Sequence, residues 1–86
     1  MELERIRKLS KEERAELLLA DLTMSEMKAV LQETILSKEN FEIAELRFLK
    51  LYTAEKIADT LGYDQRTIAH RIQFIKDRLK NTIMNI

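Results

Sequence analysis

A helix, a sharp turn and the start of a second helix are encoded in the stretch Thr53-Ala54-Glu55-Lys56-Ile57-Ala58-Asp59-Thr60-Leu61-Gly62-Tyr63-Asp64-Gln65-Arg66-Thr67-Ile68. Thr53 can cap the first helix, and Gly62, the only glycine in the chain, can end it with a positive φ angle at no steric cost. Asp64 can cap the next helix at once. Helices joined by so short a turn cross steeply, and Ala58 is small enough to let them approach. The sequence therefore predicts a helix-turn-helix between Thr53 and Lys80.

The apolar spacing of the second helix predicts which of its sides faces solvent. Apolar residues recur at helical spacing and should anchor this helix to the core: Ile68, Ile72, Ile75 and Leu79. The opposite side then carries Arg66, Ala69, His70, Gln73, Asp77 and Lys80. In a helix-turn-helix this second helix enters the major groove of DNA, so residues 65–80 are predicted to read a DNA sequence.

Eight residues are candidates for contact with double-stranded DNA. Arginine pairs bidentately with guanine and glutamine with adenine, so base contacts are predicted for the exposed side and the first turn of the helix. These residues are Gln65, Arg66, Thr67, His70 and Gln73. Phosphate contacts, which position a protein without reading sequence, are predicted for Thr53, Lys56 and Arg71.

The rest of the chain predicts an all-α fold. One glycine and no proline in 86 residues favour helices over the turn-rich sheet classes. Further helix starts are expected at Ser10, Thr23 and Ser37, and the first two are followed by glutamate in a capping box. Apolar stripes are expected at Ala15, Leu18, Leu19 and Leu22, from Met24 to Ile35, and from Phe41 to Tyr52. For residues 1–9 the sequence leaves two alternatives, a short first helix or a frayed end.

We therefore expect a single domain over residues 1–86, a bundle of five to six helices. Residues 1–36 would supply N-terminal helices that complete the core or bind a partner, and residues 37–83 would form the helix-turn-helix unit.

Charge is unevenly distributed although the formal net charge is zero. Residues 63–86 hold five lysines and arginines against two aspartates, so residues 1–62 carry the balancing negative charge. Screening limits a field to about one Debye length, so a local basic stripe is sufficient for phosphate contacts.

Other function classes are disfavoured by composition. The chain has no cysteine and a single histidine, His70, so we expect no metal site and no cofactor. No nucleophile–base pair suggests an enzyme, and no catalytic residue is predicted. The absence of cysteine suits a reducing cytoplasm. The longest apolar run, Leu17–Ala20, is far too short to span a bilayer, and the charged N-terminus does not resemble a signal peptide.

Residues 37–80 resemble the fourth conserved region of bacterial sigma factors, which reads the −35 promoter element. The match needs no gap. Leu46-Arg47-Phe48 is similar to the Leu-Arg-Tyr of that family, Thr53 to Gly62 to its Ser-x-x-Glu-Ile-Ala-x-x-Leu-Gly helix, and Asp64 to Leu79 to its recognition helix. The wingless output domains of LuxR-type regulators and phage late-gene activators look similar over the same stretch. No other sigma-factor region is present, which implies a stand-alone relative such as a small transcriptional regulator or a phage protein. The acidic residues 1–62 are expected to suit a basic partner such as RNA polymerase.

The chain also departs from the family pattern. Leu51-Tyr52 stands where a glycine is frequent, and Asp64 where a serine is frequent. Gln65 and Ala69 replace residues that are commonly basic, so the resemblance implies modest non-specific affinity for DNA.

The alternative is a protein–protein interaction module that binds RNA polymerase or another regulator. Phe74 lies off the core stripe, and it either packs against the N-terminal helices or forms an interface. Other candidates for such contacts are Met24, Met27, Ile83, Met84 and Ile86. A homodimer is also expected, because one helix-turn-helix reads only a half-site.

Overall fold

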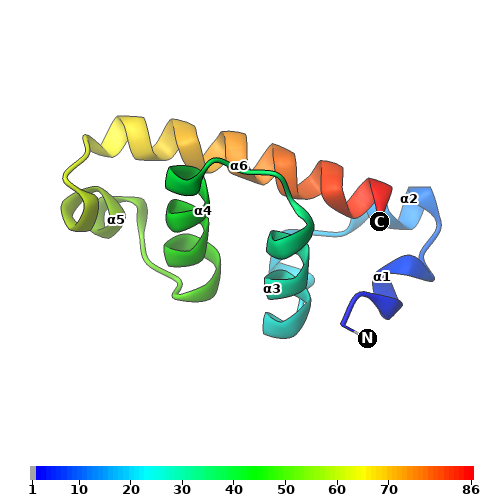
Figure 1. Ribbon diagram of the computed structural model, residues 1–86. Coiled ribbons are helices and arrows are strands. Elements are labelled where there is room, and N and C mark those ends of the chain that lie inside the picture. The colour runs from blue at the N-terminus through cyan, green and yellow to red at the C-terminus, as the bar shows by residue number, and fades with distance from the viewer. Residues whose placement is uncertain (1) are drawn as a thin grey trace. The chain divides into compact units, whose positions relative to one another are not determined.

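The computed structural model describes residues 2–86, and every regular element in this range is helical (Figure 1). Six α-helices, one 3-10 turn and one π-helical turn follow one another, which confirms the prediction of an all-α fold with five to six helices. The described chain divides into two compact units, an N-terminal unit (residues 2–35 and 78–86) and a central unit (residues 36–77). Helix α6 (Gln65–Asn85) contributes to both. That the chain forms one domain stays a prediction.

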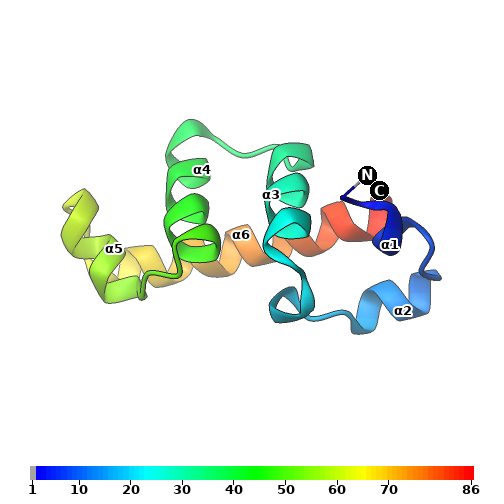
Figure 2. The ribbon, with the colours of Figure 1, turned by 90° about the horizontal axis from the view of Figure 1, so that it is seen from below.

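The N-terminal unit contains α1 (Glu4–Arg7), α2 (Lys11–Glu16), a 3-10 turn (Leu19–Asp21), α3 (Met24–Glu33) and the end of α6. Figures 1 and 2 show α3 crossing the C-terminal part of α6 steeply. Its core is formed by buried apolar side chains from α1 and the residue before it, from α3 and from the end of α6: Leu3, Ile6, Met27, Val30, Leu31, Leu79 and Ile83. Residues 1–9 thus include a short helix, and α1 is held by a buried Ile6.

The central unit contains α4 (Lys38–Ala44), a π-helical turn (Glu45–Leu49), α5 (Ala54–Leu61) and the first part of α6. In both ribbon views α4 crosses this part of α6 steeply (Figures 1 and 2). Its core is made by Ile43, Ala44, Leu46, Ile57, Ala58, Ile68, Ile72 and Ile75. The predicted anchoring stripe of α6 is confirmed, because its four residues are all buried.

The predicted helix starts are confirmed as caps. The side chains of Ser10 and Thr23 accept a hydrogen bond from the backbone N–H of the third helical residue. In each capping box the carboxylate of that residue, Glu13 or Glu26, in turn accepts one from the backbone N–H of the cap. The caps of α4 and α5 are Ser37 and Thr53, which accept single bonds of 3.1 Å from Asn40 N and Lys56 N respectively. Capping chemistry is local, so it was readable from sequence.

The predicted helical stripe from Ala15 to Leu22 is wrong. Helix α2 ends at Glu16, Leu17 and Leu18 are extended, and Leu18 is 62% exposed. Arg5 Nη2 donates to the carbonyl of Asp21 at 3.3 Å, so the separate 3-10 turn has a tertiary contact with α1.

The two following stripes end earlier than expected. Helix α3 stops at Glu33, and Ile35 is exposed. After the π-helical turn, Leu51 takes φ 60° and is exposed, while Tyr52 N donates to Leu46 O at 2.9 Å. Two candidate contact residues, Met27 and Ile83, belong to the core instead.

Candidate nucleic-acid interface

The turn between α5 and α6 is built by Gly62 and Asp64. Gly62 takes φ 78°, and the amides of Gly62 and Tyr63 both donate to the carbonyl of Ala58 at 2.9 Å. Asp64 Oδ2 then accepts from Arg66 N at 3.1 Å, and this bond caps α6. One left-handed residue and one capping carboxylate therefore set how α6 leaves α5.

The outward side of α6 is polar. Because Ile68, Ile72 and Ile75 are buried, the helical period turns the opposite side toward solvent. The exposed residues of the first three turns are Gln65, Arg66, Thr67, Ala69, His70, Gln73 and Phe74. The structure thus brings all five predicted base-contact residues onto the solvent side of one helix.

Most of these side chains make no polar contact with the described chain. Within residues 2–86, no hydrogen bond or ion pair involves the side chains of Arg66 and His70, or those of Gln65 and Thr67. Gln73 Nε2 reaches only Asp77 Oδ1, at 3.4 Å. These donors and acceptors are consequently available to a ligand without breaking an internal bond.

The predicted phosphate-contact residues differ from one another. Thr53 Oγ1 is engaged as the α5 cap, and the Lys56 ammonium lies 4.1 Å from the centre of the Tyr52 ring. Both residues are exposed at the start of α5. The Arg71 guanidinium instead donates to the Glu39 carboxylate and, at 3.1 Å, to Asn40 Oδ1.

Arg71 belongs to a polar cluster that sequence reasoning missed. Glu39 in the first turn of α4 accepts from the Tyr63 hydroxyl and from Arg71, whose guanidinium lies 5.6 Å from the centre of the Tyr63 ring. The Tyr63 hydroxyl and then the Arg71 charge lower the pKa of Glu39, while the pKa of Tyr63 is raised because it donates to that carboxylate. The cluster ties the turn and α6 to α4. Glu39 is 24 residues from Tyr63 and 32 residues from Arg71 in the sequence, so no local sequence pattern predicts the cluster.

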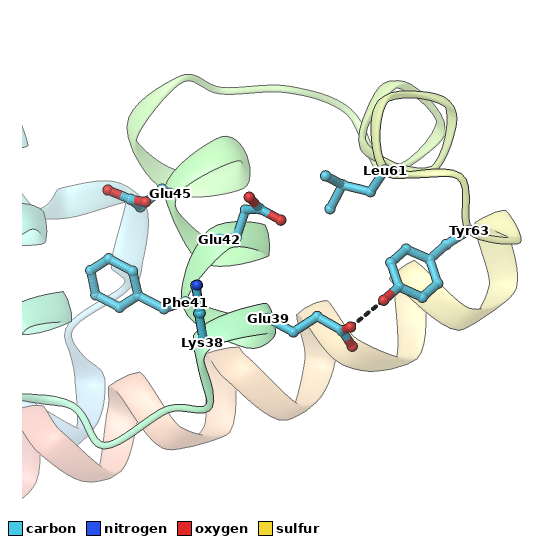
Figure 3. A pocket seen from close by; sticks show the side chains of 7 residues that line it. All are labelled: Lys38, Glu39, Phe41, Glu42, Glu45, Leu61 and Tyr63. Atoms are coloured by element: carbon cyan, nitrogen blue, oxygen red, sulfur yellow. Dashed lines mark hydrogen bonds between the residues drawn. The ribbon is translucent and has the colours of Figure 1, made fainter.

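Beside this cluster lies an open groove with a volume of about 550 Å³ (Figure 3). Its lining comes from α4, the π-helical turn, the end of α5 and the following turn: Lys38, Glu39, Phe41, Glu42, Glu45, Leu61 and Tyr63. The groove thus combines apolar and carboxylate side chains.

Comparison with protein-family models, with curated proteins and with solved structures finds no match to this chain. Among residues 2–86 no helix is long and apolar enough to cross a membrane. The same residues hold no group of three or more His, Cys, Asp or Glu side chains placed to bind a metal ion.

Proposed function

We propose that this chain is a sequence-specific binder of double-stranded DNA that regulates transcription, with α5, the Gly62 turn and α6 acting as a helix-turn-helix. The observation that carries the proposal is the row of exposed polar side chains along the first turns of α6, on a helix that starts directly after a sharp turn. In this arrangement the N-terminal part of α6 enters the major groove.

Side-chain chemistry supports base reading at this surface. The Arg66 fork fits the O6 and N7 acceptors of guanine, and the Gln73 amide fits adenine. Because the side chain of Arg66 forms no polar contact within residues 2–86, its guanidinium can bind a base without first giving up a partner. Gln65, Thr67 and His70 flank it on the same side.

Phosphate contacts would position the helix. Exposed Thr53 and Lys56 at the N-terminus of α5 suit this role, since backbone N–H groups and positive charge at a helix start favour an anion. Arg71 would have to leave Glu39 and Asn40 to reach a phosphate, so we expect it to contribute less than Lys56.

The resemblance to sigma factor region four extends the proposal to partners. A single helix-turn-helix reads a half-site, so a homodimer or contact with RNA polymerase would supply the remaining affinity. A cytoplasmic location and the absence of enzymatic activity follow from the same proposal.

The decisive experiment selects bound sequences from random DNA duplexes and then measures affinity for the selected site. We expect Arg66→Ala to lose about 1–3 kcal/mol of binding at one base position. Lys28→Ala is the matched control, because it removes one positive charge from an exposed position of α3. The affinity of the wild-type protein should also fall steeply with salt.

Either of two results would remove the assignment of α6 as the reading helix. One is that no sequence is enriched by the selection. The other is equal affinity in Arg66→Ala and Lys28→Ala for an enriched site.

A protein-interaction module is the second candidate, and Phe74 favours it. This side chain is 52% exposed on the outward side of α6, four residues after His70. An exposed aromatic is a frequent anchor of protein interfaces. Unchanged DNA affinity in Phe74→Ala, together with loss of a dimer or of polymerase binding, would support this candidate.

A further inference from the structure

The groove beside α4 offers an apolar surface that the chain itself leaves open. The side chains of Phe41, Leu61 and Tyr63 contribute to its lining, and each is only partly buried. Figure 3 shows Leu61 and Tyr63 on one side of α4 and Phe41 on its other side, with Glu42 on the side of Leu61. Such partly exposed apolar side chains favour a ligand that covers them.

The charge of the lining restricts what this ligand can be. Glu42 and Glu45 are exposed, and within residues 2–86 neither carboxylate forms an ion pair or a hydrogen bond. The Glu39 carboxylate is already occupied by Tyr63 and Arg71. Lys38 supplies the only positive charge in the lining, so the groove is acidic.

We propose that this groove docks a basic, amphipathic segment of another protein. Apolar side chains of the partner would cover Phe41 and Leu61, while its lysines or arginines would pair with Glu42 and Glu45. Nucleic acid and acidic peptides are disfavoured, because their charges would meet unpaired carboxylates. The inference is independent of DNA binding, since none of these residues lies among the predicted DNA contacts.

The test uses a synthetic amphipathic helical peptide of leucine and lysine as the probe. The same peptide with glutamate in place of lysine is the negative control. Nuclear magnetic resonance should show that the lysine peptide shifts the amides of Phe41, Leu61 and Tyr63 in the intact chain. The glutamate peptide should shift none of them.

A charge reversal then distinguishes specific binding in the groove from general electrostatic attraction to the chain. Glu42→Lys/Glu45→Lys should weaken binding of the lysine peptide at least about tenfold. Glu16→Lys/Glu33→Lys makes the same change at exposed positions of the N-terminal unit and should leave most of the affinity. Unfolding curves check that both double variants are folded.

Three outcomes would overturn the proposal: no binding of the lysine peptide by the wild-type chain, shifts that map outside the groove, or equal weakening by the two charge reversals. None of them bears on the DNA selection experiment, so the two proposals fail separately.

Discussion

The two units of this chain use their charged side chains differently. In the N-terminal unit, the two arginines Arg5 and Arg14 are committed to the fold. Arg5 binds Glu26 through two 2.8 Å hydrogen bonds, and Arg14 donates to the backbone carbonyls of Arg7, Leu9, Ile83 and Ile86 at 3.0–3.2 Å. In the central unit, Arg66 and His70 are exposed and make no such contact within the described chain.

The difference separates residues that stabilise from residues that are free to bind. Short helices such as α1 and α2 are marginal by themselves, so the N-terminal unit needs side chains that close its backbone groups. The central unit is anchored by buried isoleucines from α4, α5 and α6, and it leaves one side of α6 to solvent. Mutations in the first unit should therefore act on folding, and those on the exposed side of α6 on ligand affinity alone.

The largest expected effect comes from matched cavities in α6. Ile68 in the central unit and Ile83 in the N-terminal unit are both fully buried. Ile68→Ala and Ile83→Ala should each lower the free energy of unfolding by about 2–5 kcal/mol, because apolar contacts are lost and a cavity remains. Urea unfolding followed by circular dichroism measures the loss.

Hydrogen exchange shows whether the units respond separately. We expect Ile68→Ala to reduce amide protection mainly in α4 and α5, and Ile83→Ala mainly in α1 and α3. Uniform loss of protection across residues 2–86 in both variants would mean that the two units unfold as one.

An intermediate effect is expected at the ion pair of the N-terminal unit. Glu26 is buried, and its hydrogen bonds from Arg5 and then from Thr23 lower its pKa to about 2 against the opposing effect of burial. Because Arg5 is half exposed, solvent screens part of this interaction. Glu26→Gln should lower the free energy of unfolding by about 1–3 kcal/mol at neutral pH.

The pH dependence gives this prediction a sign. A carboxylate whose pKa is lower in the folded chain stabilises it above the unfolded pKa, near 4.5, and this contribution disappears as pH falls toward 2. The stability difference between the wild-type chain and Glu26→Gln should thus be constant above pH 5 and shrink between pH 4.5 and 2. Glu13→Gln, in the exposed capping box of α2, is the control. A difference that does not change with pH would contradict the role given to Arg5.

The sequence predicted those features of the fold that depend on residues close together in the chain. The five caps, the Gly62 turn and the buried side of α6 each follow from residues within a few positions of one another, and the structure confirms them. That α6 reads DNA stays a prediction, because burial and exposure alone do not identify a ligand.

What the sequence did not predict depends on distant partners or on backbone angles. The Glu39 cluster and the contacts of Arg14 with the carbonyls of Ile83 and Ile86 join residues 24 to 72 positions apart. The extended Leu17-Leu18 segment interrupts a regular apolar pattern, so periodicity alone placed a helix there. The helical stripe predicted from Phe41 to Tyr52 includes Leu51, which takes a left-handed φ instead.

The smallest expected effect concerns that left-handed residue. A side chain at φ 60° costs about 1–2 kcal/mol, whereas glycine adopts this angle freely and loses about 0.5–1 kcal/mol through its more flexible unfolded chain. Leu51 is 70% exposed, so little packing is lost on substitution. Leu51→Gly should therefore stabilise the chain by about 0.5–1 kcal/mol in thermal unfolding. The matched control is Leu18→Gly in the N-terminal unit, where a leucine of similar exposure (62%) has an extended backbone and glycine should destabilise by a similar amount. Glycine effects of the same sign at both positions would contradict backbone strain at Leu51, whereas opposite signs would support it.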